Sequence, residues 1–341
     1  MGDPVRITLE RNPSPDAAAR VDGYRHETVL VRDSADDSIV GMGTRTVREV
    51  FYNGEICRIG YLGNLRAATS RRGLKRLAAG YDGIRATRDA TELPFDLTSI
   101  AGDNLPARRL LQKGLRSLPR YRAQAELSTF ILGSDGSSGT SPAELARPED
   151  LAEIVALLNR YNRDFQFAHV YSEQDLLSAS RSPGLAATDF IVLREQGRIS
   201  ACVALWDQRA FKQTVVQSYA RWLGLARPLL NLGRAVLGKP PYPRAPHVLP
   251  MAFLSHFAMP DPDRDRLAAL IGTARRLAHS KNIQYLATGF CERHPCHVLI
   301  RRGFRHQHYR STLFSVHWRD CDIADELKMR NSVPHSEVAL L

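Results

Sequence analysis

The chain has 341 residues, a length that favours about two domains rather than one. Hydrophobic residues make up 43% of it and charged residues 24%, values typical of globular proteins, which excludes a disordered or fibrous chain. Lys and Arg number 47 and Asp and Glu 36, which leaves a net charge of +11. This excess of positive charge favours a polyanionic partner, namely a phosphorylated cofactor, a nucleic acid or an anionic membrane.

Three features of the sequence bear on the compartment in which the protein works. A run of about 18 uninterrupted apolar residues is missing, so we expect no membrane-spanning helix. The first residues lack the apolar core of a signal peptide, so we do not expect secretion by that route. The 5 cysteines are odd in number and mostly dispersed, which favours the reducing cytoplasm: they are Cys57, Cys202, Cys291, Cys296 and Cys321.

A polar run near the middle of the chain marks a boundary. Residues 133–142 contain no apolar side chain and are rich in Gly and Ser, so the sequence predicts a flexible linker there. We therefore expect two domains, residues 1–132 and residues 143–320. We expect residues 321–341, which are mostly polar, to form a surface extension or an arm that swaps between copies.

Hydrophobic periodicity and turn residues predict the elements of the first half. Asn53-Gly54 is a strong hairpin signal because both residues tolerate positive φ, and Asn104 followed by Pro106 is typical of a helix start. In chain order we predict strands at 27–32, 39–52 and 55–67, a helix at 73–90, a strand at 95–100, a helix that starts after Asn104 and ends at Gly114, and a strand at 124–132.

The second half repeats this order of strands and helices. In chain order we predict strands at 190–194, 199–207 and 248–259, a helix over 267–278, a strand at 283–288, a helix from His294-Pro295 to Gly303, and a strand at 311–318. The last helices of the two halves share a pattern, in which Pro106, Leu110, Leu111 and Gly114 recur as Pro295, Leu299, Ile300 and Gly303, each 189 positions later. The repeat indicates a duplicated domain.

An insertion at residues 218–237 interrupts the second half. It is rich in leucine and carries Arg221, Arg227 and Arg234, so it suits an interfacial helix or a lid over a fatty acyl chain. A packed helical insertion that covers a sheet fits the same composition. Pro228 and two glycines argue against one continuous helix.

Two short segments carry a family resemblance. Residues 103–114 read Asp-Asn-Leu-Pro-Ala-Arg-Arg-Leu-Leu-Gln-Lys-Gly, which is similar to the late-helix motif Asn-x-x-Ala-x-x-Leu-Tyr-x-x-x-Gly of the GCN5-related N-acetyltransferase (GNAT) superfamily. Leu65-Arg66-Ala67, followed by Arg71-Arg72-Gly73, resembles the cofactor loop of that superfamily. The resemblance implies an α/β (α+β) fold class with two tandem GNAT-like acyl-CoA N-acyltransferase domains, each a mixed, mostly antiparallel sheet with flanking helices.

The resemblance also implies a co-substrate and its site. Coenzyme A carries a pyrophosphate and a 3′-phosphate, and a helix N-terminus with nearby arginines suits such groups. We expect acetyl-CoA or a longer acyl-CoA, without a metal, bound by Leu65, Arg66, Ala67, Arg71, Arg72, Gly73, Leu74, Lys75 and Asn104. We expect the backbone of residues 65–67 to polarise the thioester carbonyl.

The sequence departs from the family pattern in both halves. Lys75 and Leu77 take the two glycine positions of the cofactor loop in the first half. In the second half Leu267 and Ala269 take them, and aspartates at positions 261, 263 and 265 add negative charge. We therefore place the acyl-CoA in the first half.

The general acid of the family is a tyrosine in the late helix, a position that holds Leu111 and Ile300 in the two halves of this chain. Neither side chain can protonate a leaving thiolate. Tyr61 on the preceding strand and Tyr121 after the late helix are the candidates that take its place.

Several histidines and cysteines also need an interpretation. Residues 291–297 hold two cysteines and two histidines, which we interpret as a strand-to-helix junction rather than a metal site. A reactive cysteine or an acceptor-site histidine is the alternative. We interpret His256 as a core or surface histidine, with a catalytic base as the alternative.

These observations predict a tandem-domain acyl-CoA N-acyltransferase, with an N-acetyltransferase as first choice. An amine acceptor, either a small molecule or a peptide, would attack the thioester directly. Two other functions stay open at this point: a transferase of the Fem type that takes an aminoacyl group from tRNA, and a non-catalytic ligand-binding module. The sequence also leaves a homodimer open.

Overall fold

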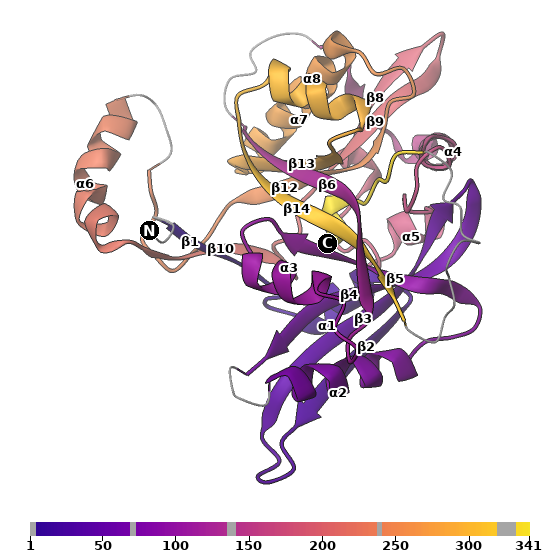
Figure 1. The fold of residues 1–341 in the computed structure, drawn as a ribbon. Helices are drawn as coiled ribbons and strands as arrows, with labels where there is room; N and C mark the ends of the chain where they lie inside the picture. The colour runs from indigo at the N-terminus through magenta and orange to yellow at the C-terminus, as the bar shows by residue number, and fades with distance from the viewer. Residues whose placement is uncertain (1–4, 69–72, 135–140, 237–240, 319–331) are drawn as a thin grey trace.

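A computed structural model describes residues 5–68, 73–134, 141–236, 241–318 and 332–341 (Figure 1). The first half contains β1 (Val5–Glu10), α1 (Pro15–Asp22), β2 (Arg25–Arg32), β3 (Ile39–Tyr52), β4 (Glu55–Ala67), α2 (Gly73–Ala86), β5 (Glu92–Ala101), α3 (Leu105–Gln112) and β6 (Arg120–Gly133). The second half contains β7 (Glu144–Leu145), η1 (Pro148–Asp150), α4 (Leu151–Asn162), α5 (Glu173–Leu177), η2 (Ala187–Asp189), β8 (Phe190–Glu195), β9 (Arg198–Trp206), β10 (Gln213–Tyr219), α6 (Arg221–Val236), β11 (His247–Val248), β12 (Met251–Ala258), α7 (Arg264–Ser280), β13 (Tyr285–Cys291), α8 (Pro295–Gly303), β14 (His306–His317) and η3 (Val338–Leu340).

The predicted elements of both halves are confirmed, several of them with small shifts at their ends. β3 and β4 have the predicted bounds, and the turn between them has positive φ at Asn53 (55°) and Gly54 (87°). Helix α2 ends four residues earlier than predicted. The hydroxyl and the N–H of Thr87 both donate hydrogen bonds to the carbonyl of Ile84, which closes the last turn at that point.

Eleven strands form one sheet in the order β2-β3-β4-β5-β14-β6-β13-β12-β9-β8-β7. The last strand of each half lies within the sheet of the other half, because β14 lies between β5 and β6, and β6 lies between β14 and β13. β6 and β14 pair antiparallel from His306↔Leu132 to His317↔Arg120, at the centre of the molecule (Figure 1). Each half therefore completes its sheet with a strand from the other half.

The first half is packed on both faces of its sheet. Helices α2 and α3 cover one face, where Tyr81 packs with Leu62 and Phe314. The opposite face is covered by the second half, because Phe167 stacks on Tyr52 with 5.8 Å between ring centroids. The two halves therefore share a core as well as a sheet.

The C-terminal residues fold into the interior. The expectation that residues 321–341 form a polar surface extension is wrong for residues 332–341, because residues 334–340 are buried and η3 packs on β12 and β13. Figure 1 shows the C-terminus at the centre of the molecule, beside β14. The apolar residues of η3 explain this burial, since they would otherwise face water. Residues 319–331 lie outside the described part of the chain.

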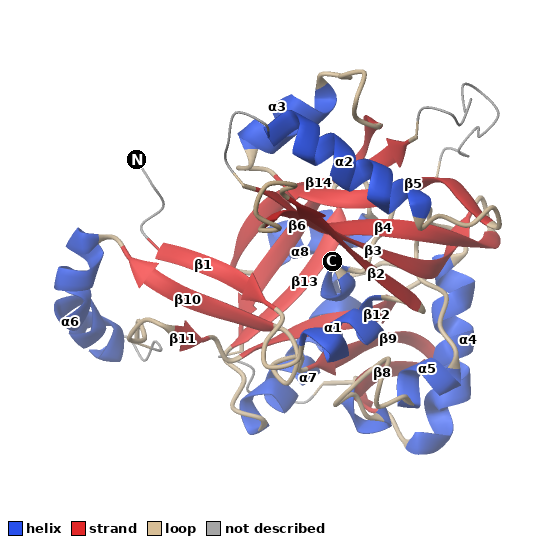
Figure 2. Ribbon diagram, turned by 90° about the horizontal axis from the view of Figure 1, so that it is seen from below, coloured by secondary structure: helices blue, strands red, loops and turns tan. Residues whose placement is uncertain are grey.

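A separate three-stranded sheet, β1-β10-β11, carries α6 away from the main body (Figure 2). α6 is one helix over Arg221–Val236, so the prediction of a break at Pro228 is wrong. Proline lacks the N–H that would bond to the Gly224 carbonyl, but both residues are exposed and water can bond to that carbonyl instead. In the described ranges, every helix is too short or too polar to cross a membrane.

The strand exchange predicts that the two halves cannot be separated without unfolding. A protease site placed between residues 134 and 141 allows the connection to be cut after folding. Because β6 pairs with both β13 and β14, we expect the two fragments to co-elute from a sizing column in native buffer and to separate in concentrated urea. Separation of the fragments in native buffer would contradict the exchanged topology.

Candidate functional site

Strands β4 and β5 run parallel and then separate. The last residue pair between them is Tyr61↔Leu97, although both strands continue beyond it. Just past this pair, the hydroxyl of Thr98 donates a hydrogen bond of 2.8 Å to the carbonyl of Leu62. The separation opens the sheet at the C-terminal ends of the two strands, where their peptide groups no longer pair with each other.

β4 contains a β-bulge just after this point. Its register with β3 shifts between Thr44↔Gly63 and Met42↔Arg66, so that two residues of β4 face one residue of β3. Asn64 is the first of the two and has a φ of 51°, a left-handed conformation that asparagine tolerates better than most residues. A bulge of this kind changes the direction in which the following peptide groups point.

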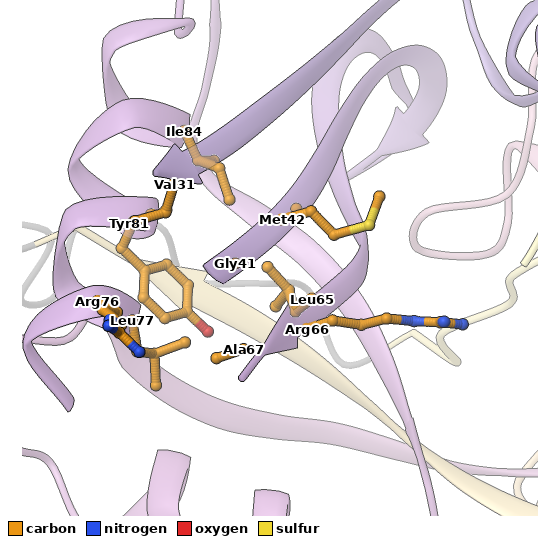
Figure 3. Close-up of a pocket in the computed structure, with 12 residues that line it drawn as sticks. Val31, Gly41, Met42, Leu65, Arg66, Ala67, Arg76, Leu77, Tyr81 and Ile84 are labelled. Atoms are coloured by element: carbon orange, nitrogen blue, oxygen red, sulfur yellow. The ribbon is translucent and has the colours of Figure 1, made fainter. Parts of the chain in front are cut away.

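The bulge also distributes the side chains that follow it. Leu65 and Tyr81 line a small cavity between β4 and α2, whereas the side chain of Arg66 extends away from that helix (Figure 3). Residues 63–67 are half-buried or exposed. Solvent therefore reaches this stretch of β4, which is the stretch that the sequence predicts to contact the thioester.

Helix α2 starts at Gly73, six residues after the end of β4. The first N–H groups of a helix have no intrahelical partner and lie at the positive end of its dipole. Leu74 and Lys75 are exposed in this first turn. The helix start can therefore attract an anion, with the Lys75 ammonium beside it.

The other basic residues near α2 differ in their surroundings. Arg76 forms an ion pair with Asp33 and is engaged within the protein. Arg66 is exposed at the end of β4. Arg71 and Arg72, which the sequence predicts as phosphate ligands, lie outside the described residues.

The turn from β5 to α3 is held at both ends. The side chain of Asn104 accepts a hydrogen bond of 3.3 Å from the N–H of Ala107, which confirms the predicted helix cap. The N–H of Gly102 donates a hydrogen bond of 2.7 Å to the carbonyl of Arg310 in β14. Asn104 is exposed in this turn, which follows the end of β5.

A buried ion pair spans β4 at the point where it leaves β5. Arg45 of β3 and Asp96 of β5 are 2.8 Å apart (Nη2 to Oδ1), and Arg45 also bonds to Glu92. The Trp318 indole donates a hydrogen bond of 2.8 Å to the second oxygen of Asp96. β4 runs between these strands, and a Cβ at its Gly60 would overlap both Arg45 and Asp96. Glycine at this position therefore lets the pair fix the three strands.

Tyr61 lies at the start of the opening. Its hydroxyl is 2.7 Å from the hydroxyl of Ser99 and accepts a hydrogen bond of 3.1 Å from the Ser99 N–H. The guanidinium of Arg48 lies 4.3 Å from the centroid of its ring. Burial raises the pKa of Tyr61, so the phenol keeps its proton at neutral pH.

Tyr121 occupies a different environment from Tyr61. It is buried beneath α2 on β6, and its hydroxyl is 2.5 Å from that of Tyr81. Burial raises the pKa of Tyr121 well above its ordinary value. Tyr121 faces Tyr81 beneath α2, whereas Tyr61 lies where β4 and β5 separate, so the proposed site uses Tyr61.

The second half repeats the two main features of β4. β12 pairs in parallel with β13 only as far as Phe253↔Ala287. A bulge follows the pair Ser255↔Ala204, where His256 has a φ of 50°. The second half therefore has its own separation of strands, with its own bulge at the corresponding point.

The C-terminal segment fills this second opening. One carboxylate oxygen of Glu337 accepts a hydrogen bond of 3.0 Å from the N–H of His256, and the other accepts one of 3.2 Å from the N–H of Ala339. Val338 packs directly on Gly289 of β13, where a Cβ would overlap it. A carboxylate of the protein thus occupies the bulge of the second half.

The helix after β12 is capped by its own sequence. The carboxylate of Asp263 accepts hydrogen bonds from the N–H groups of Asp265 (2.8 Å) and Arg266 (3.0 Å). A phosphate at this helix start would meet that negative charge. Residues 255–259 are all buried, in contrast to the accessible residues 63–67. Of the two openings, the one in the first half is accessible to a ligand.

The cysteines and histidines near α8 belong to the interior. Cys291 and Cys296 are buried, and burial raises the pKa of both thiols, that of Cys296 to about 12. His294 caps α8 by accepting the N–H of Cys296, and its Nε2 is 3.0 Å from the Tyr161 hydroxyl. The strand-to-helix interpretation is confirmed. The part of the chain that the structure describes holds no group of three or more His, Cys, Asp or Glu arranged for a metal.

Sequence reasoning missed the features that make the openings. Asn64 and His256 each have only a weak residue-type signal, because asparagine and histidine are enriched at positive φ but most of them adopt negative φ. Gly60 and Asp96 appear as an ordinary strand glycine and an isolated acidic residue until the sheet places Gly60 between Arg45 and Asp96. The apolar residues 338–341 at the end of a polar tail were the available signal for the C-terminal segment.

The fold is similar to that of known acyltransferases. It matches Saccharomyces cerevisiae N-myristoyltransferase with bound myristoyl-CoA (TM-score 0.51, 10% identity, 84% of this chain and 69% of that one). It also matches a GCN5-related N-acetyltransferase from Sphaerobacter thermophilus (TM-score 0.52, 13% identity, 85% and 80%). A third match is the GCN5-related glucosamine N-acetyltransferase region of a fungal multi-domain GH3 beta-N-acetylglucosaminidase (TM-score 0.58, 11% identity, 92% and 38%).

These matches confirm the predicted α/β fold class, and the chain has a fold similar to those of GCN5-related N-acetyltransferases and of an N-myristoyltransferase. No family model matches its sequence, and no curated protein does. With identities of 10–13%, the similarity lies in the fold.

Gly60 lies between the paired side chains of Arg45 and Asp96, so one added methyl group at this position should greatly lower the stability of the protein. We expect Gly60→Ala to lower the free energy of unfolding by roughly 3–5 kcal/mol, because it forces apart a buried ion pair. Gly233→Ala is the matched control, since a Cβ at Gly233 in α6 meets no described atom within 4 Å. Urea titrations of both variants test this, and equal stabilities would contradict the role of Gly60.

The buried Glu337 predicts a pH dependence. Burial raises its pKa from 4.5 to about 7, so between these values the folded state holds a proton that the unfolded state has released. Its contribution to stability is therefore greatest at pH 4.5 and below, and it is lost as the pH rises to about 7. Relative to Glu337→Gln, we expect the wild type to lose up to ~3 kcal/mol of unfolding free energy across this window.

Urea titrations of both proteins at several pH values provide this difference. The buried histidines, whose lowered pKa values act in the opposite direction, are present in both proteins and cancel. A difference that does not change with pH would contradict a protonated, buried Glu337.

Proposed function

We propose that the protein is an acyl-CoA-dependent N-acyltransferase whose co-substrate binds in the opening between β4 and β5. The observation that carries this proposal is the contrast between the two halves. Both have separated strands and a bulge, but the second opening is filled by Glu337 and Val338 while residues 63–67 are accessible. The similarity of the fold to an N-myristoyltransferase that binds myristoyl-CoA supports the ligand class.

In this proposal the extended pantetheine arm of the acyl-CoA lies along the edge of β4. The peptide groups that no longer pair with β5 provide hydrogen bonds to its amides. The N–H groups after the bulge, from Leu65 to Ala67, point at the thioester carbonyl and stabilise the negative charge that develops on its oxygen. Gly73, Leu74 and Asn104 then border the same opening.

The phosphates of the co-substrate would lie at the N-terminus of α2. The free N–H groups and the dipole of that helix favour negative charge. Exposed Lys75 and Arg66 add positive charge there. Arg71 and Arg72 belong to the proposal on sequence grounds.

The reaction in this proposal is a direct transfer. The nitrogen of a neutral amine attacks the thioester carbonyl carbon, a C–N bond forms, and the C–S bond breaks with release of the coenzyme A thiolate. Tyr61, which burial keeps protonated, donates its proton to that thiolate. The amine nitrogen releases a proton as the amide forms, and the Ser99 hydroxyl, 2.7 Å from the Tyr61 hydroxyl, can relay a proton that restores the Tyr61 phenol.

The acyl group and the acceptor are proposed only as classes. Acetyl is the first choice for the acyl group, with longer chains as the alternative, and the acceptor is the amine of a small molecule or a peptide. A second domain at residues 143–320, joined through residues 133–142, would shape the acceptor side, because Tyr61 lies on the sheet face that Phe167 covers.

Calorimetric titration tests the site in the first half. We expect the wild type to bind one equivalent of acetyl-CoA or of a longer acyl-CoA. Lys75→Glu reverses a charge beside the phosphates and should weaken binding on the order of tenfold or more. Arg264→Glu is the matched control, because Arg264 is an exposed basic residue in the first turn of α7 and should leave the affinity unchanged.

Two outcomes would contradict the proposal. If Lys75→Glu and Arg264→Glu weakened acyl-CoA binding equally, this would contradict the placement of the phosphates at the N-terminus of α2. Failure of acetyl-CoA and of longer acyl-CoAs to bind, together with salt-sensitive binding of an aminoacyl-tRNA, would favour the Fem-type function instead.

A further inference from the structure

Helix α6 has an exposed apolar stripe along its whole length. The stripe consists of side chains that are 63–82% exposed, namely Trp222, Leu225, Leu229, Leu232 and Val236. Their spacing of three and four residues places them on one face of the helix. Soluble proteins rarely expose a continuous apolar surface of this kind without using it to bind something.

The opposite face of α6 is already used within the protein. Leu223 is buried, and the side chain of Asn231 bonds to both the N–H (2.8 Å) and the carbonyl (3.1 Å) of Tyr242. The guanidinium of Arg234 lies 4.5 Å from the centroid of the Tyr242 ring. These contacts fix the rotation of the helix about its axis, so the apolar stripe faces outward by construction.

Because of the position of α6, a large, flat partner can contact the apolar stripe. The helix is at the end of the arm formed by β1, β10 and β11, apart from the main body in two views (Figure 1, Figure 2). β1 of the same arm also exposes Ile7 (52%) and Leu9 (57%). A flat partner can therefore meet the arm without meeting the rest of the protein.

The charges of α6 indicate which kind of partner surface the stripe binds. The helix contains Arg221, Arg227 and Arg234 and no acidic residue, and the whole chain carries +11. Two copies of the helix that met through their stripes would bring two positively charged chains together without a carboxylate from either helix. An anionic lipid surface offers the opposite charge to the arginines and an apolar layer to the stripe.

We propose that α6 binds the surface of an anionic lipid membrane, with its apolar stripe in the boundary between headgroups and acyl chains. Trp222 and the leucines enter that boundary, and the exposed Arg221 beside Trp222 contacts the lipid phosphates. The helix lies in the plane of the membrane surface, as an amphipathic helix of this composition does. This binding is independent of the acyl-CoA site and holds whether or not the protein is an acyltransferase.

The chain contains its own probe for this binding. It has 3 tryptophans, of which Trp206 and Trp318 are buried (1% and 4% exposed) and Trp222 is 63% exposed. Vesicles of phosphatidylcholine mixed with phosphatidylglycerol should shift the fluorescence of Trp222 to shorter wavelength. Vesicles of phosphatidylcholine alone should give a much smaller shift, and Trp222→Phe should abolish the shift in both cases.

Co-sedimentation of the full chain with the mixed vesicles tests the stripe itself. Leu225→Ser combined with Leu229→Ser should lower the partition coefficient on the order of tenfold or more, because it removes two side chains from the apolar layer. Ile56→Ser combined with Leu177→Ser is the matched control. It removes two exposed side chains (56% and 62%) from the main body and should leave partition unchanged.

Three results would overturn the proposal. The first is failure of the wild type to bind the mixed vesicles, and the second is equal binding by the two double variants. The third is a dimer in light scattering that Leu225→Ser with Leu229→Ser dissociates, without vesicle binding by the wild type, which would identify a second copy of the chain as the partner of the stripe.

Discussion

The antiparallel pairing of β6 with β14 holds the two halves of the molecule together. It joins the end of each half to the sheet of the other, so that the two halves form one sheet and share one core. Because β14 is also paired with β5, the chain that leaves β14 starts beside the first half. Residues 332–341 then return to the interior and pack on β12 and β13. The exchange therefore makes one half a structural part of the other.

The two halves contain similar openings between parallel strands, but the two openings differ in what occupies them. Each has a pair of parallel strands that separate and a bulge with a positive φ, at Asn64 in one half and His256 in the other. In the second half a buried carboxylate of Glu337 accepts the N–H of the bulge, and Asp263 caps the next helix. Carboxyl groups of the protein thus occupy the places where an acyl-CoA would put its carbonyl oxygen and its phosphates. This asymmetry is the reason that we propose ligand binding in the first half and a supporting role for the second.

The sequence predicted those strands, turns and helix caps that are determined by neighbouring residues. Alternation and the Asn53-Gly54 turn give β3 and β4 their bounds, and Asn104 caps α3 as expected because a cap needs only its own helix. The strand exchange was not predictable, since either final strand fits either half by its pattern. The bulge at His256 has only a weak residue-type signal, because histidine is enriched at positive φ without marking a bulge, so neither the second opening nor its filling by Glu337 could be predicted from the sequence. α6 stays helical through Pro228 because the Gly224 carbonyl, which loses its N–H partner there, is exposed and can bond to water.

The opening beside β4 is the proposed acyl-CoA site, and its counterpart beside β12 is filled by the protein itself. Hydrogen–deuterium exchange of the full chain with and without saturating acyl-CoA, followed by peptide mass spectrometry, measures both places at once. We predict slower exchange of residues 63–68 and of the first turn of α2, with residues 255–259 and the first turn of α7 unchanged. Protection of the second set without the first, or of neither, would contradict this proposal.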